Sequence, residues 1–296
     1  MTDRSRSKKK KTAIVFGLTS NHIFAVACVM MDLKKVNPGI SDEIVIFYDN
    51  ELTKRDKGLL NGILPSRFIK YDFPISDTSI FNQGTLNYFS KMVFSKFECL
   101  RLLDEYENVL WLDYDILVTG DLSELITPCE SGIKMMPSPG CPVRNQLHEP
   151  INDYDMDAEA NCASTFVFQD NLKNYQQLYA FCYAKLEQYA KYLYCPEQAI
   201  FDFMIQEFKL KIEPIDYKVY SPHPLDPGVE DARIVHAFGQ PKFWNGLQNE
   251  QWNSNYNRWK ALGGTRFEVS FKSKLASKLS KVKSQLVAAL RGTLRK

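Results

Sequence analysis

Two aspartates, one residue apart, follow a short apolar segment in the middle of the chain. Asp113 and Asp115 come directly after residues 108–112, which read NVLWL and predict a buried strand. Neighbouring carboxylates raise each other's pKa unless a cation lies between them, so the pair favours a divalent metal. Mg²⁺ and Mn²⁺ bind carboxylate oxygens and leave positions open for phosphate oxygens. Asp-x-Asp also arises by chance in surface loops, but a loop that leaves a buried strand is held in place.

His236 is a candidate third ligand, because it follows the apolar residues Ile234 and Val235. A lone histidine after such residues can also be an ordinary core side chain. Its neighbours favour a binding role, since Gly239 permits close approach of the backbone and Lys242 offers a point charge for a phosphate. Together these residues predict a site that holds a diphosphate through a metal and a lysine.

The elements that must position these residues alternate between strand and helix patterns. Such alternation predicts an α/β fold with a mainly parallel, mixed sheet and right-handed crossovers. Ligands of such sheets bind beyond the carboxyl ends of the strands, so we expect residues 19–21 and 113–115 to share one crevice. Residues 137–159 are a candidate lid or acceptor loop. The predicted strands are 13–18, 43–48, 68–73, 108–112, 133–136, 165–168 and 233–237, and the predicted helices are 21–35, 53–64, 86–106, 171–192 and 196–207.

Charge divides the 296 residues into a body and two basic ends. Residues 1–11, a basic leader expected to be disordered, carry +5, and residues 269–296 carry +8. Subtracting both from the net charge of +2 leaves −11 for the body, residues 12–268. An acidic body argues against a nucleic-acid-binding groove, whereas the ends are typical of segments that bind an anionic surface.

The C-terminal segment has apolar residues at three- and four-residue spacing among lysines and arginines. This pattern predicts a basic amphipathic helix, which suits a membrane interface, packing on the body or a protein partner. No window holds the 18 or so apolar residues of a membrane span, and seven scattered cysteines suit reduced thiols. We therefore expect a cytoplasmic protein, peripheral on the cytosolic face of a membrane, with oligomerisation left open. The apolar residues of this helix are Phe271, Leu275, Leu279, Val282, Leu286 and Leu290.

Two segments resemble motifs of glycosyltransferase family 8. Residues 109–118 (VLWLDYDILV) with 120–125 (GDLSEL) are similar to its Asp-x-Asp segment, and residues 236–244 (HAFGQPKFW) resemble its motif H-x-x-G-x-x-K-P-W, with Phe243 where proline is usual. The resemblance covers residues 12–250. It implies a GT-A, Rossmann-like fold and a retaining, metal-dependent hexosyltransferase. The enzyme would move glucose or galactose from a UDP-sugar to a glycan, glycolipid or protein, with Mn²⁺ or Mg²⁺ on Asp113, Asp115 and His236.

The same resemblance implies roles for other residues. Glu197 and Gln198 match the family's Asp-Gln pair beside the reacting sugar and are the candidate catalytic residues. Lys96 matches a basic residue that contacts the donor, and Cys162, Ala163 and Ser164 stand where Asn-Ala-Gly is common. The implied donor-binding residues are Phe16, Gly17, Thr19, Asn21, His22, Lys96, Asp113, Tyr114, Asp115, Ala163, Ser164, Gly239 and Lys242.

Simpler interpretations remain open for several of these residues. Lys96 and Gln198 could be surface side chains, Glu197 an acid in a helix's first turn, and Cys162 and Ser164 small residues packed in a strand.

Other functions also remain open. One is glycogenin-like self-glucosylation, which would use one of 15 tyrosines as the acceptor. Another is a non-catalytic, membrane-associated module that binds a nucleotide-sugar. A nucleotidyltransferase is a third, although residues 17–21 contain one glycine and no lysine or arginine, unlike the usual basic phosphate loop.

Overall fold

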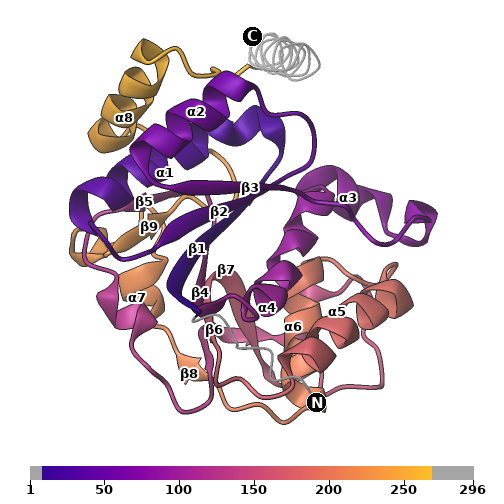
Figure 1. Cartoon of the computed structure of the whole chain (residues 1–296). Helices are drawn as coiled ribbons and strands as arrows, with labels where there is room; N and C mark the ends of the chain where they lie inside the picture. The colour runs from indigo at the N-terminus through magenta and orange to yellow at the C-terminus, as the bar shows by residue number, and fades with distance from the viewer. Residues whose placement is uncertain (1–8, 269–296) are drawn as a thin grey trace, which may run out of the picture. The chain divides into compact units, whose positions relative to one another are not determined.

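A seven-stranded mixed sheet, in the order β3-β2-β1-β4-β7-β6-β8, organises the computed structural model, which describes residues 9–268 (Figure 1). β1 pairs in parallel with β2 and β4, β2 with β3 and β6 with β8, whereas β7 runs antiparallel to β4 and β6. The expected mixed and mainly parallel sheet is confirmed. The strands are β1 (Lys10–Leu18), β2 (Glu43–Tyr48), β3 (Ser66–Lys70), β4 (Tyr106–Leu112), β6 (Ile133–Pro142), β7 (Glu159–Gln169) and β8 (Glu213–Pro214).

A second, two-stranded sheet joins β5 (Ile116–Val118) to β9 (Ile234–His236). The strands are antiparallel, and Ile116 lies opposite His236. Because β5 begins just after Asp115, this pairing brings two parts of the chain that are about 120 residues apart to the same place.

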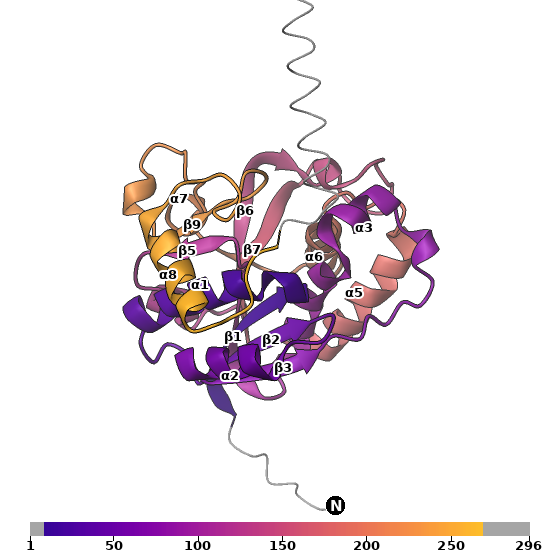
Figure 2. The same ribbon diagram turned by 90° about the horizontal axis from the view of Figure 1, so that it is seen from above.

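Helices cover both faces of the large sheet (Figures 1 and 2). α1, α2 and α8 lie on one side, and α4, α5 and α6 on the other. The short helix η3 contacts α4 and α6, α3 contacts η3, and α7 lies near β9. The bounds are α1 (Ile23–Val36), α2 (Lys54–Ile63), α3 (Gln83–Phe89), η3 (Lys91–Phe97), α4 (Glu98–Leu102), α5 (Tyr175–Tyr189), α6 (Pro196–Glu207), α7 (Tyr217–Tyr220) and α8 (Glu250–Ala261).

The central strand β1 is buried on both faces, as a parallel strand between two helical layers must be. Ala13 and Val15 face a core shared with η3, α4, α5 and α6, and the intervening Ile14 and Phe16 are fully buried on the opposite face. Because successive strand residues point to opposite faces, one apolar run supplies both cores.

One predicted element was wrong. The helix expected over residues 86–106 is instead α3, η3 and α4, and Tyr106 already belongs to β4. The break falls at Ser90, whose φ of 59° cannot continue a right-handed helix and whose side chain accepts a hydrogen bond from the Met92 amide. The break turns the chain so that Lys96, on η3, is buried.

Residues up to Thr265 form one unit, and a second begins at Arg266. Only residues 266–268 of the second unit are described, so the predicted C-terminal helix lies outside the described residues. Residues 1–8 of the predicted leader also lie outside them. No helix within residues 9–268 is long and apolar enough to cross a membrane.

Candidate active site

Asp113 leaves the carboxyl end of β4 in a fixed orientation. Its amide donates to the carbonyl of Ser164 on β7, and its Oδ1 accepts a 2.8 Å hydrogen bond from the indole of Trp111. Trp111 is buried and stacks on Phe166 from the neighbouring strand. The carboxylate is therefore positioned by a core side chain rather than by a loop.

His236 reaches the same place from β9. Its Nε2 lies 3.3 Å from Oδ1 of Asp115 and 4.0 Å from Oδ2 of Asp113. On the other side of the ring, Nδ1 is 2.9 Å from the hydroxyl of buried Ser221. When a metal is bound, Nδ1–H can donate to this hydroxyl, which leaves the lone pair of Nε2 free for the metal, as in most metal-binding histidines.

These three residues fit a divalent cation. One ligand atom from each of Asp113, Asp115 and His236 lies within 4.8 Å of the other two. Two carboxylates and an imidazole are a donor set suited to Mn²⁺ and acceptable to Mg²⁺. Burial alone would raise the pKa of Asp115, but His236 and Lys242 hold it well below its ordinary value, so this carboxylate is ionised.

Lys96 joins the candidate metal ligands to α6. Its Nζ lies 2.9 Å from Oε1 of Glu197 and 3.2 Å from Oδ1 of Asp113. All three side chains belong to different elements, and both Lys96 and Glu197 are buried. Burial lowers the pKa of Lys96, but the two carboxylates outweigh it and raise the pKa, so the lysine is charged. The exposed-helix interpretation of Lys96 is wrong.

Glu197 has one oxygen to spare. Its Oε2 is buried and has no hydrogen-bond partner among the described residues. An unpaired buried carboxylate oxygen is costly, so its presence points to a ligand that donates a hydrogen bond. Gln198 lies beside it, and its side-chain oxygen accepts a 3.1 Å hydrogen bond from the amide of Ala163 on β7.

The turn after β1 faces the candidate metal ligands, as expected. The hydroxyl of Thr19 is 2.6 Å from Oδ1 of Asn21 and 2.7 Å from Nδ1 of His22. The ring of His22 stacks on Tyr114 at 5.3 Å, and Tyr114 stacks on Trp244 at 6.2 Å. Burial lowers the pKa of His22, so the ring is neutral at pH 7. These side chains offer flat aromatic faces next to the carboxylates.

The other predicted donor-binding residues differ in what surrounds them. Lys242 donates to Asp115 and to the carbonyl of Ala237. Gly239 has a φ of 68°, with no atom within 4 Å of where a Cβ would stand. The side chain of Phe16 is fully buried, so only its backbone can meet a ligand. Gly17 is required by packing, because a Cβ there would lie 2.2 Å from Ser95 and 2.7 Å from Trp111.

The family model for glycosyl transferase family 8 matches residues 13–248. The chain belongs to this family. It has a GT-A fold and is a glycosyltransferase. No curated protein sequence gave a match.

Solved glycosyltransferase structures share its fold. The galactosyltransferase LgtC, crystallised with donor and acceptor sugar analogues, is 14% identical, with a TM-score of 0.62 over 88% of this chain and 99% of that one. The bifunctional WbbM is 12% identical, with a TM-score of 0.61 over 88% of this chain and 52% of WbbM. GlyE of Streptococcus pneumoniae TIGR4 is 15% identical, with a TM-score of 0.55 over 86% of this chain and 64% of GlyE.

Three residues near the site of this glycosyltransferase escaped sequence reasoning. Ser221 orients His236, and nothing in its local sequence marks it. Trp244 was recognised only as part of a motif, although its ring lies against Tyr114 and His22. Asp49, which accepts hydrogen bonds from the amide and hydroxyl of Ser20, was detectable, because it follows β2 as Asp113 follows β4.

Proposed function

We propose that this chain is a retaining, metal-dependent hexosyltransferase that uses a UDP-sugar, with glucose or galactose as the sugar. The observation that carries the proposal is one constellation of buried and partly buried side chains: the Asp113, Asp115 and His236 cluster, connected through Lys96 to a glutamate with an unpaired oxygen. The cluster of two aspartates and a histidine suits a metal-bound diphosphate, and the glutamate suits a sugar hydroxyl. The proposed acceptor is a glycan, glycolipid or protein.

Asp113, Asp115 and His236 would hold Mn²⁺, or Mg²⁺ in its place. When bound, the ion supplies positive charge that stabilises the leaving diphosphate. Lys242 contacts Oδ2 of Asp115, whereas His236 contacts Oδ1, and it supplies a second positive charge. The neutral ring of His22, with Tyr114 and Trp244, offers stacking faces for a uracil base.

Glu197 and Gln198 are the residues proposed to act at the sugar. Lys96 holds Oε1 of Glu197, so Oε2 is oriented to accept a hydrogen bond from a sugar hydroxyl. The side-chain oxygen of Gln198 is engaged by the amide of Ala163, which fixes the side chain against β7. An amide is a poor nucleophile, so we assign Gln198 to orienting or stabilising the oxocarbenium-like sugar.

The proposed reaction keeps the anomeric configuration without a covalent enzyme intermediate. The acceptor hydroxyl oxygen attacks the anomeric carbon from the face that UDP leaves. The bond from the anomeric carbon to the diphosphate breaks, and the hydroxyl proton passes to a diphosphate oxygen. The role of the chain is to position both groups and to stabilise the separating charges.

A donor screen tests the proposal. Purified protein is incubated with UDP-glucose, UDP-galactose, UDP-N-acetylglucosamine or UDP-glucuronate, with Mn²⁺ or EDTA, and released UDP is measured. We expect metal-dependent release from UDP-glucose or UDP-galactose. Asp113→Asn should remove most of it, because one metal ligand is lost while the oxygen that accepts from Trp111 remains. The matched control is Asp72→Asn at an exposed position. Full turnover by Asp113→Asn with Mn²⁺ would refute the metal assignment.

The alternatives predict different outcomes of the same experiment. Self-glucosylation would add hexose to the protein itself, which intact mass spectrometry detects as steps in mass. A non-catalytic module would bind UDP without releasing it from any donor, with or without an acceptor. Pyrophosphate-dependent exchange would indicate a nucleotidyltransferase.

We also propose that the segment 269–296 holds the enzyme at an anionic membrane. The support is its sequence, with eight basic residues and none acidic among regularly spaced apolar side chains. Replacing Leu279 and Leu286 with aspartate should reduce cosedimentation with anionic vesicles and leave UDP release unchanged. Vesicle binding equal to that of the wild type would contradict this assignment.

A further inference from the structure

A groove of about 410 Å³ lies between α1, α2 and α8, on the side of the sheet shown at the upper left of Figure 1. We call it the basic groove. Its apolar wall comes from Met31, Leu59, Ile63 and Leu262, and its positive charges from Lys34, Lys35 and Arg258. Gly58 and Gly62 complete the lining. The groove is separate from the active site, since it lies along the C-terminal halves of α1 and α2.

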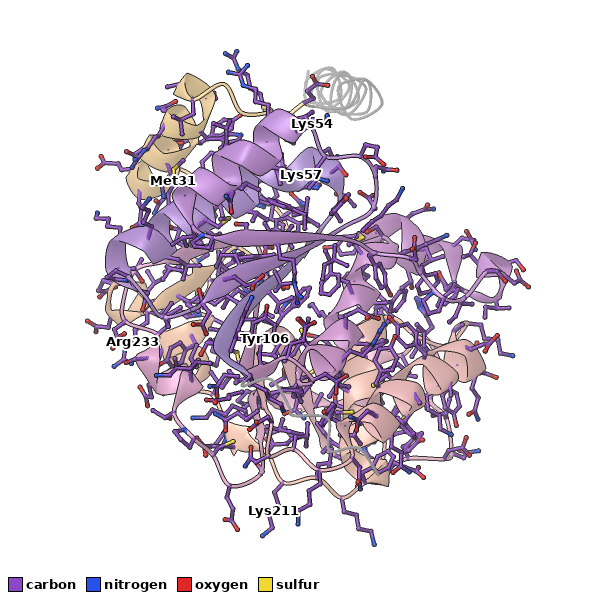
Figure 3. The ribbon with its side chains drawn as sticks, viewed as in Figure 1. Met31, Lys54, Lys57, Tyr106, Lys211 and Arg233 are labelled. Carbon is purple, nitrogen blue, oxygen red and sulfur yellow. The ribbon has the colours of Figure 1, made fainter. Side chains whose placement is uncertain are left out.

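The charge of this groove opposes that of the body. Lys34, Lys35 and Arg258 are all exposed, and no carboxylate lines the groove. Among the described residues, none of the three forms an ion pair within 4.0 Å. Lys54 and Lys57 of α2 add positive charge on the same side of the molecule, far from Lys211 (Figure 3). The body as a whole carries −11, so the charge that lines this groove is opposite in sign to that of the body.

Two glycines keep the groove open. Gly58 and Gly62 are one helical turn apart in α2, and both line it. Nothing lies within 4 Å of where a Cβ would stand at either position, and neither requires a positive φ. Glycine inside a helix is unfavourable relative to alanine. Internal packing therefore does not explain the pair, whereas a ligand that approaches the α2 backbone would.

The chain leaves its first unit beside this groove. The amide and hydroxyl of Thr265 donate to the carboxylate of Asp56 in α2, at 2.9 and 2.7 Å, and Arg55 donates to the carbonyl of Leu262. The basic segment 269–296 thus begins four residues after a point fixed to α2. That segment carries +8, so its charge disfavours its own binding in a groove lined by three cations.

We propose that the basic groove binds the anionic headgroup of a membrane lipid and places the α1, α2 and α8 face against the bilayer. Exposed cations bind the phosphate, and the apolar wall receives the adjoining glycerol and acyl carbons. Stable anchoring at a membrane takes two signals, and the groove would supply one in addition to segment 269–296. The inference rests on the proposed membrane association of segment 269–296, but not on the proposed sugar or metal.

Cosedimentation of the full-length protein with vesicles tests the inference. The vesicles contain phosphatidylcholine alone, or phosphatidylcholine with about 30 mol % phosphatidylglycerol, which supplies a negative surface. The groove variant is Lys34→Glu/Lys35→Glu/Arg258→Glu. The matched control, Lys173→Glu/Lys211→Glu/Lys218→Glu, makes the same change in net charge at exposed positions elsewhere. The tail variant is Leu279→Asp/Leu286→Asp.

One basic residue near an anionic surface contributes about fivefold to partitioning, so the groove variant should bind anionic vesicles at least about tenfold more weakly. The charge-matched control should fall by less than about threefold, and UDP release in solution should be unchanged in both. Equal binding by the groove variant and the wild type, with loss in the tail variant, would overturn the groove but keep the tail. Equal losses in groove and control variants would also overturn it. Absence of wild-type binding would refute membrane association while leaving the transferase proposal intact.

Discussion

Replacing Lys96 with methionine tests whether this lysine holds the site together. The change keeps the length of the side chain and removes the charge that lies between Glu197 and Asp113. Glu197 is 4% exposed and would keep a buried carboxylate with neither oxygen paired to a cation. Removing one partner from a buried ion pair costs about 3–5 kcal/mol of unfolding free energy. We expect a loss in this range.

A second variant separates charge from packing. Lys96→Met/Glu197→Gln removes the uncompensated carboxylate, so it should recover about 1–3 kcal/mol relative to Lys96→Met alone. Urea unfolding at pH 7, followed by tryptophan fluorescence and circular dichroism, measures both values. The double variant should remain inactive, because Oε2 of Glu197 is no longer a carboxylate oxygen.

A loss below about 1 kcal/mol in Lys96→Met would refute the structural role of Lys96, because it would mean that water already screens Glu197. A double variant less stable than Lys96→Met would refute that role as well. If the double variant recovered stability and kept full activity, the ion pair would have a structural role only. The proposed role of Glu197 at the sugar would then be excluded.

Three further predictions concern the pH, the helix α2 and the metal. Burial raises the pKa of Asp202 to about 7, so the folded state keeps a proton that the unfolded state releases above about pH 4. The free energy of unfolding should therefore fall by up to about 4 kcal/mol as the pH rises from about 4 to 7. Asp202→Asn should abolish this pH-dependent part in urea titrations. Gly58→Ala and Gly62→Ala should each raise the melting temperature, gaining about 0.5–1 kcal/mol, since each Cβ meets open space; a decrease would show that the glycines are needed for the fold. Ser221→Ala should weaken Mn²⁺ binding, measured by calorimetry, about 10- to 100-fold by releasing the ring of His236, and unchanged affinity would contradict its orienting role.

Sequence patterns located the elements that carry the site. The strand before Asp113 and the helix that begins at Pro196 were predicted because each is a run of strong local signals: apolar β-formers in one, and proline with an acidic first turn in the other. The shared crevice also followed from a general rule about parallel sheets. The pairing of Lys96 with Glu197 could not be predicted from the sequence, since it depends on packing between elements about 100 residues apart.

The miss between residues 86 and 106 has a specific cause. Helical periodicity continues across Ser90, so a pattern of apolar spacing cannot register a single residue with positive φ. β5 and α8 were also unpredicted. The first is only three residues long, and the second has few buried side chains, chiefly Trp252 and Trp259, to produce a periodic signal.

The pairing of β5 with β9 also sets when the proposed metal site becomes complete. Asp113 and Asp115 are translated more than 120 residues before His236, which reaches them only when β9 adds to β5. A nascent chain on the ribosome therefore carries the two acids without their histidine or Lys242 for most of the synthesis of the second half. We expect ribosome-stalled chains that end before β9 to have the large sheet's first strands but no tight manganese affinity. The proposed nucleotide-sugar site would then be complete only after β9 has left the exit tunnel.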